Sequence, residues 1–263
     1  KNFRNIKIVL ESHGDFINTL ELEKNLIFPA VYRKLFLKMA SYTINKADIL
    51  RAVSSSTEEQ ALSFDPSKRV VRFPAWVDFE IFSKVQASRS DEKDFKILFI
   101  GSVTDRKKPH LIVEAINKIK NKDIKLYVVG PTPNENYLSQ LKELVHNYDL
   151  EDQVLFTGSV DRKSVMDHYA DTNLMILPSV SEGLARVIFE SQATACPVLV
   201  TDAPGMGDIV IDGQTGYIFE SDNLESLTNK IQEIINNYND AVHVGNNAKD
   251  FILSNYSADN FKF

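Results

Sequence analysis

The 263 residues carry a net charge of −6, and 43% of them are hydrophobic while 25% are charged. These proportions are ordinary for a globular chain that buries a sizeable core, and the negative net charge argues against nucleic acid or another polyanion as the main partner. The sequence has no run of about 20 apolar residues that could span a membrane. Its single cysteine, Cys196, excludes an internal disulfide.

The first part of the chain, residues 1–82, predicts part of an α/β domain. Three strands are predicted from apolar runs, at 6–10, 48–54 and 69–73. Apolar residues at helical spacing predict a helix over 29–46, and a second helix is expected after the middle strand, with Ser56 or Thr57 as its N-cap. A segment rich in serine and charge, 83–94, is the expected linker to a second domain.

His13 follows the first predicted strand in the loop Glu11-Ser12-His13-Gly14-Asp15. Side chains at the carboxyl end of a strand in an α/β sheet are well placed to meet a ligand. The alternative is a turn histidine that hydrogen-bonds a local neighbour. The residues alone leave both interpretations open.

The helix predicted over 29–46 has a basic face made of Arg33, Lys34, Lys38 and Lys46. A basic amphipathic helix can meet a membrane surface or an anionic acceptor. The alternative is an ordinary solvated face. The N-terminus lacks the apolar core of a signal peptide, so we expect a cytoplasmic location, with the inner face of the membrane as a second option.

From residue 95 to residue 263 the pattern is one of strands alternating with helices. The strands are predicted at 96–101, 125–130, 153–158, 174–177, 197–201 and 216–219. Helices are expected between them, and two more close the chain. This alternation predicts a doubly wound parallel sheet, in which ligands bind outside the carboxyl ends of the strands.

The segment 174–201 predicts a strand, a turn at Gly183, a helix over 185–195 and a second strand. Glu182 precedes the helix, and Glu190 follows after seven residues. Carboxylates are good acceptors for the paired hydroxyls of a sugar or ribose, and the free N–H groups of a helix's first turn attract an anion. The alternative is that Glu182 favours the positive helix end while Glu190 is a solvated residue.

The spacing from Glu182 to Glu190, followed by Ala193, Ala195, Pro197 and Val198, resembles the signature of retaining GT-B glycosyltransferases of family 4. The resemblance implies that Glu182 contacts the donor sugar and Glu190 the ribose of the nucleotide. It also implies that backbone after the first Glu binds sugar hydroxyls and phosphate, a role that falls on Gly183, Leu184 and Val187. The sequence departs from the family at Leu184, Ala185 and Cys196, where an aromatic and two glycines are usual.

Three cations follow the first strand of the second domain, in the stretch Gly101-Ser102-Val103-Thr104-Asp105-Arg106-Lys107-Lys108. Cations at a strand's carboxyl end can neutralise a leaving diphosphate, and the alternative is a solvated basic loop. The family has an Arg directly after the Gly and a Lys five positions later. Lys107 resembles that Lys, whereas Ser102 replaces the Arg, so Arg106 or Lys108 is expected to compensate.

Other site residues follow from the resemblance alone. Gly130 and Val160 lie in loops after the next two strands, and the family reads the nucleobase with main-chain groups near the second loop. Members also carry a histidine at the end of a strand of the first domain, facing the donor, and His13 resembles it. Because so few residues precede the linker, the resemblance implies a chain that lacks much of the N-terminal domain.

No Asp-x-Asp motif and no cluster of His and Cys ligands occur in the sequence. We therefore expect no metal and no cofactor, with a nucleotide sugar as donor substrate. The predicted function is hexosyl transfer, with retention, to a hydroxyl of a glycan or a lipid-linked acceptor, as in polysaccharide biosynthesis. Two alternatives remain, a related GT-B sugar phosphorylase or epimerase, and a non-catalytic nucleotide-sugar-binding module.

Overall fold

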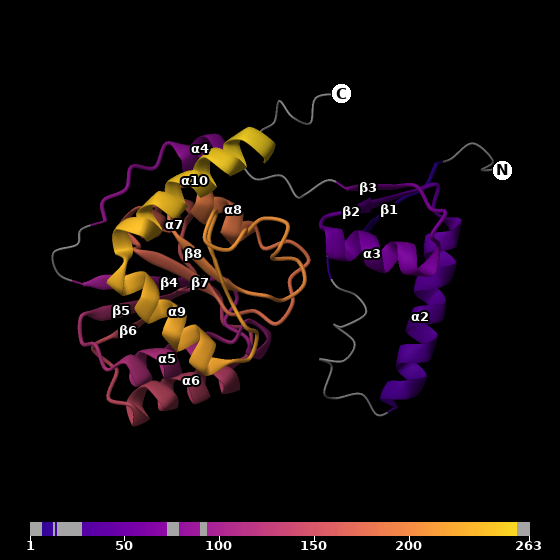
Figure 1. Ribbon diagram of the computed structural model, residues 1–263. Coiled ribbons are helices and arrows are strands. Elements are labelled where there is room, and N and C mark those ends of the chain that lie inside the picture. The colour runs from indigo at the N-terminus through magenta and orange to yellow at the C-terminus, as the bar shows by residue number, and fades with distance from the viewer. Residues whose placement is uncertain (1–6, 13, 15–27, 73–78, 90–93, 257–263) are drawn as a thin grey trace. The chain divides into compact units, whose positions relative to one another are not determined.

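The computed structural model describes residues 7–12, 14, 28–72, 79–89 and 94–256 (Figure 1). The chain divides into two compact units. One consists of Lys1–Trp76 with Ser181–Ala185, and the other of Val77–Val180 with Arg186–Phe263. Helix α4 (Phe79–Ser83) packs against a helix of the second unit. The predicted domain limits at 82, 83–94 and 95 stay a prediction.

The first unit contains a three-stranded parallel sheet in the order β1-β2-β3. Its strands and helices are β1 (Val9–Ser12), α2 (Pro29–Lys46), β2 (Ile49–Ala52), α3 (Ser55–Phe64) and β3 (Val70–Arg72). A small core joins them through Ile44, Ala47, Leu50 and Ala61. The strand predicted at 6–10 ended too early, because pairing with β2 continues beyond the apolar run to Ser12, and Glu11 forms an ion pair with its cross-strand neighbour Arg51 at 3.0 Å.

The N-cap predicted at Ser56 or Thr57 is wrong, because helix α3 is capped by Ser54. The Ser54 hydroxyl accepts a hydrogen bond from the Thr57 N–H, and the Thr57 hydroxyl accepts one from the Ser54 N–H. This reciprocal pair is a capping box, in which the third helical residue supports the cap. Thr57 therefore contributes to the helix start from inside the helix.

The second unit is built on a six-stranded parallel sheet in the order β6-β5-β4-β7-β8-β9. The strands are β4 (Phe95–Ile100), β5 (Ile124–Val129), β6 (Val154–Gly158), β7 (Leu174–Leu177), β8 (Val198–Thr201) and β9 (Tyr217–Phe219). The chain enters at β4, moves outward to β6 and returns to β7 on the other side of β4. The order of the strands thus reverses between β4 and β7, which is where open α/β sheets bind ligands.

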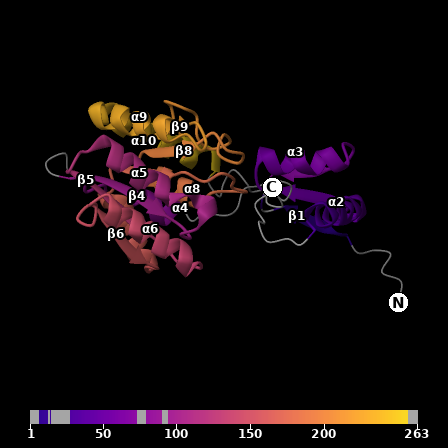
Figure 2. The ribbon, with the colours of Figure 1, turned by 90° about the horizontal axis from the view of Figure 1, so that it is seen from below.

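Helices cover both faces of this sheet, as expected for a doubly wound fold (Figure 1). One face carries α5 (Pro109–Ile119) and α6 (Glu135–Asn147), and the other carries α7 (Arg162–Asp171) and α8 (Arg186–Ala193). Figure 2 shows α9 (Leu224–Asn236) beside β8 and β9 at one end of the sheet and α6 beside β6 at the other. Helix α10 (Tyr238–Tyr256) packs against α8. The predicted α/β class is confirmed.

Candidate functional site

The carboxyl ends of β4 and β5 touch through two glycines. Gly101 and Gly130 have φ angles of 142° and 137°, a region that side chains rarely adopt. A Cβ atom on Gly130 would lie 2.1 Å from the carbonyl oxygen of Gly101. Both positions therefore favour glycine, and the backbones of the two strand ends lie in close contact.

The Lys107 side chain lies close to Gly101, at the end of β4. Lys107 ends the short 3₁₀ helix η1 (Asp105–Lys107), whose N-cap is Thr104. A Cβ atom on Gly101 would be 3.1 Å from the Lys107 Nζ and 3.4 Å from its Cδ. The side chain thus folds back toward the end of β4, as a cation that meets a diphosphate there must do.

The neighbours of Lys107 have other roles. The carbonyl of Arg106 accepts a hydrogen bond from the Val180 N–H at 3.2 Å, which joins the loops that follow β4 and β7 at the point where the strand order reverses. Lys108 has a left-handed backbone and forms an ion pair with Asp222. That Arg106 or Lys108 replaces the family's arginine stays a prediction. Ser102 is half-buried beside Val103, whose N–H donates to the Pro131 carbonyl.

Glu190 lies on α8, the helix between β7 and β8. Helix α8 begins at Arg186, and Glu190 lies one turn further along. Burial raises the pKa of Glu190, while the Arg186 charge, a hydrogen bond from Tyr169 and the Arg162 charge act in the opposite direction. Glu190 is half-buried, so its side chain is only partly solvated.

A tyrosine that the sequence did not single out supports this carboxylate. The Tyr169 hydroxyl lies 3.2 Å from the Glu190 Oε2 and 3.2 Å from the carbonyl of Val187. In the sequence Tyr169 is one aromatic residue in a helix that precedes a buried strand, a pattern that predicts a core residue. Its contact with Glu190 joins two consecutive helices, α7 and α8, across 21 positions of the sequence, so no local signal marks it.

The remaining predicted residues are placed as follows. Glu182 is buried, and Gly183 and Leu184 are half-buried, in Ser181–Ala185, the segment that groups with the first unit. Val160 is half-buried in the loop between β6 and α7. The N–H of Gly130 donates to the Gly158 carbonyl near this loop at 2.8 Å. His13 lies outside the described residues.

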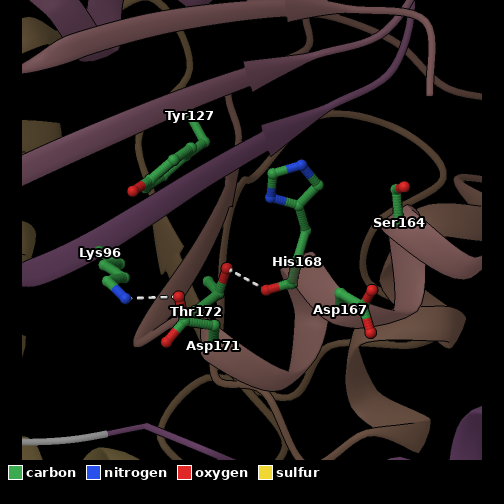
Figure 3. Close-up of a pocket in the computed structure, with 7 residues that line it drawn as sticks. All are labelled: Lys96, Tyr127, Ser164, Asp167, His168, Asp171 and Thr172. Carbon is green, nitrogen blue, oxygen red and sulfur yellow. Dashed lines mark hydrogen bonds and ion pairs between the residues drawn. The ribbon is translucent and has the colours of Figure 1, made fainter.

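A separate cavity of about 280 Å³ lies beside α7, away from the carboxyl ends of the strands (Figure 3). Its lining residues are Lys96, Tyr127, Ser164, Asp167, His168, Asp171 and Thr172. The His168 ring points toward the Tyr127 ring, and Lys96 forms an ion pair with Asp171. Because Lys96 lies near the start of β4, this cavity is distinct from the loop of Lys107, which follows the end of that strand.

Over the described ranges, no group of three or more His, Cys, Asp and Glu residues is arranged to hold a metal ion. Within the same part of the chain, every helix is too short or too polar to cross a bilayer.

Comparison with known proteins identifies relatives along most of the chain. Residues 80–251 match the model of the family described as glycosyl transferases group 1. An uncharacterized glycosyltransferase of Methanocaldococcus jannaschii is 30% identical over 165 residues, which cover 61% of this chain and 44% of that protein. N-acetyl-alpha-D-glucosaminyl L-malate synthase of Bacillus anthracis is 24% identical, over 97% of this chain and 65% of its own length.

A solved structure shows the same fold. Anabaena HepE, in complex with UDP-glucose, has a TM-score of 0.80 at 17% identity, and the match covers 95% of this chain and 68% of that one. The chain therefore spans only part of the length of the proteins it matches. Its α/β fold is that of the GT-B glycosyltransferases, and because the family model covers more than half of the sequence, the chain belongs to the glycosyl transferases group 1 family.

Proposed function

We propose that this chain belongs to a retaining glycosyltransferase that moves a hexosyl group from a nucleotide-diphosphate sugar to a hydroxyl of a glycan or a lipid-linked acceptor. The observation that carries the proposal is the Lys107 ammonium over Gly101, at the point where the strand order reverses. The hydrogen bond from Val180 to Arg106 supports it, because it ties the Lys107 loop to the segment that leads to Glu190. HepE is in complex with UDP-glucose, a donor of the proposed class.

Each residue takes a distinct part in the proposed reaction. Lys107 neutralises charge on the leaving diphosphate, since a fixed cation stabilises charge that develops in the transition state. Glu190 accepts hydrogen bonds from the ribose hydroxyls, Glu182 holds the sugar, and His13 approaches the donor. The bond from the sugar's anomeric carbon to the diphosphate breaks as the acceptor oxygen bonds to the same face. The acceptor's proton passes to the departing phosphate, and no metal takes part.

Thermal unfolding with UDP, GDP and ADP, free and sugar-linked, tests donor binding. A nucleotide at about 100 times its Kd adds roughly 2.7 kcal/mol of stability, enough for a clear rise in Tm. We expect a rise with one base, lost in Lys107→Ala. The matched control is Lys122→Ala, an exposed lysine in the loop that precedes β5, at the opposite edge of the sheet. A rise that survives in Lys107→Ala would contradict the role of Lys107.

Product analysis with the selected nucleotide sugar separates the proposal from its alternatives. We expect transfer to a hydroxyl acceptor with the donor's anomeric configuration kept, and full activity after dialysis against EDTA. Inorganic phosphate as the required co-substrate would identify a phosphorylase. Nucleotide binding without turnover in the complete protein would identify a binding module.

We also propose that helix α2 brings the enzyme to the inner face of a membrane. The helix contains four basic residues and no acidic residue, and it exposes an apolar stripe at helical spacing, formed by Val31, Tyr32, Leu35, Met39 and Tyr42. Such a helix fits an anionic lipid surface. We expect co-sedimentation with phosphatidylglycerol vesicles but not with pure phosphatidylcholine. The double change Leu35→Gln and Met39→Gln should abolish it, whereas Leu155→Gln, at an exposed position of β6, should not.

A further inference from the structure

Tyr169 occupies an unusual position for a polar side chain. Its ring is fully buried on α7, yet its hydroxyl reaches two acceptors on α8, the Glu190 Oε2 and the Val187 carbonyl, each at 3.2 Å. Burial and the nearby Glu190 charge raise the pKa of Tyr169 well above its ordinary value. The hydroxyl therefore keeps its proton and acts as a donor. A carboxylate is the stronger of the two acceptors, because hydrogen bonds to an ionised group are shorter and stronger.

The surrounding residues hold Tyr169 in this position. The Phe82 ring packs edge-to-face against the Tyr169 ring, with centroids 6.0 Å apart. Arg89 donates from Nη2 to the Tyr169 carbonyl at 3.4 Å and to the Thr194 carbonyl at 3.0 Å, and from Nη1 to the Ala195 carbonyl at 2.9 Å. One guanidinium thus links the backbone of α7 to the end of α8. The distance between the two helices is fixed by contacts independent of the Tyr169 hydroxyl.

The hydrogen bond from Tyr169 engages only one of the two carboxylate oxygens of Glu190. Oε2 accepts from Tyr169, while no donor in the described part of the chain hydrogen-bonds Oε1. A glutamate side chain without such an anchor rotates among several rotamers, and fixing it costs conformational entropy on binding. Held at one oxygen, the carboxylate presents the other to a ligand hydroxyl in a single orientation.

We propose that Tyr169 is a positioning residue that orients the Glu190 carboxylate toward the ribose hydroxyls of the donor nucleotide. This inference rests on the proposed function, because it takes Glu190 as the ribose-binding group. Tyr169 itself contacts no substrate in this account. Its hydroxyl sets how well the site distinguishes a ribonucleotide from a 2′-deoxyribonucleotide.

The test measures Kd for UDP, GDP and ADP and for their 2′-deoxy counterparts, and compares the ratio for the base that binds. Hydrogen bonds to a charged group predict a preference for ribose of about tenfold or more. We expect Glu190→Ala to remove this preference. Tyr169→Phe should reduce it by about three- to tenfold, while the affinity for the deoxynucleotide stays unchanged within about twofold. A merely structural role of the hydroxyl would weaken both nucleotides alike.

The matched control is Tyr137→Phe. Tyr137 is also a buried tyrosine with a hydrogen-bonded hydroxyl, 2.7 Å from the His110 Nδ1, but it lies on α6. Its change should leave the ribose preference intact. If Tyr169→Phe keeps the ribose preference while Glu190→Ala loses it, the positioning role of Tyr169 is overturned and the ribose contact of Glu190 stands. A preference kept by Glu190→Ala would overturn the proposed ribose contact itself.

A second variant covers the case in which Tyr169→Phe does not fold. Glu190→Gln keeps an oxygen that can accept a hydrogen bond from the Tyr169 hydroxyl. The amide therefore stays oriented, with its NH₂ group toward the ligand. We expect this variant to retain more of the ribose preference than Glu190→Ala. Equal ratios in the two variants would contradict positioning by Tyr169.

Discussion

Helices with similar apolar patterns are buried in one unit and exposed in the other. Helices α2 and α5 both begin at a proline and carry apolar residues at helical spacing. In α5 these residues are buried, because α9 and the sheet pack against them. In α2, Val31, Leu35 and Met39 remain exposed. Periodicity in a sequence therefore predicts which face of a helix is apolar, while the layer that lies against that face decides whether it forms core.

The sheets show the same contrast. Strands β7 and β8 are buried at every residue, as expected for parallel strands covered on both faces. In β1 every second residue is exposed, and Val9 keeps 56% of its surface in contact with solvent. The residues that we assign to nucleotide binding lie in segments that adjoin this deeply packed sheet, Lys107 in η1 after β4 and Glu190 in α8 between β7 and β8, where a rigid scaffold holds the loops.

The largest effect is expected from breaking the close approach of β4 and β5. Gly130→Ala would force a Cβ against the Gly101 carbonyl oxygen at a φ angle unfavourable for alanine. We expect a loss of at least about 3 kcal/mol of unfolding free energy, measured by urea denaturation followed by circular dichroism. Gly213→Ala is the control, because Gly213 also has a positive φ but has open space around it, and should cost only about 1 kcal/mol. Equal losses would mean that backbone strain alone matters at Gly130.

The next effect concerns Glu182, in the short segment Ser181–Ala185 that groups with the first unit. In the complete protein, Glu182→Ala should lower kcat by a factor of about 100 to 1,000, because a group that holds the sugar in the transition state is lost. The exposed Glu143→Ala on α6 is the control. Initial rates of transfer give both values, and near-normal turnover of Glu182→Ala would remove Glu182 from the site.

A pair of leucines tests the contrast between the units directly. Leu126 in β5 is fully buried, whereas Leu35 in α2 is 57% exposed. Leu126→Ala should cost about 2–5 kcal/mol, because it leaves a cavity in the core. Leu35→Ala should change stability by less than about 0.5 kcal/mol, since alanine is as good a helix former and little surface is buried there. A large loss for Leu35→Ala would show that the α2 stripe is covered in solution.

The sequence predicts the second unit well for a physical reason. Its strands are continuous apolar runs bounded by Gly and Pro, so 174–177 and the helix starts at 109 and 162 agree with the structure. It predicts less well where polar contacts extend an element, as at Glu11 in β1 and Ser54 in α3. Pairings between distant residues, such as Lys108 with Asp222 and Tyr169 with Glu190, leave no local pattern. The sequence alone therefore does not reveal the hydrogen bond from Tyr169 to Glu190.

The smallest effect is a difference in acid sensitivity between the units. Asp48 in the first unit accepts a hydrogen bond from the Ile8 N–H, which holds its pKa below the ordinary 3.8. Its contribution to stability is present above that value and is lost only as pH falls through the lowered pKa. Burial has the opposite effect on Glu190 and raises its pKa above the ordinary 4.5. The folded state takes up this proton readily, so protonation of Glu190 does not itself unfold the chain.

Acidification from pH 7 should therefore abolish the preference for ribose over deoxyribose while circular dichroism is unchanged. The ratio of the two Kd values reports Glu190, because the titration of the phosphates is common to both nucleotides. In Tyr169→Phe the preference that remains should be lost at higher pH, since the hydrogen bond that favours the charged carboxylate is gone while Arg186 and Arg162 remain. A ratio that stays constant down to pH 4.5, or that falls only together with the circular dichroism signal, would contradict the half-buried Glu190 as the ribose-binding group.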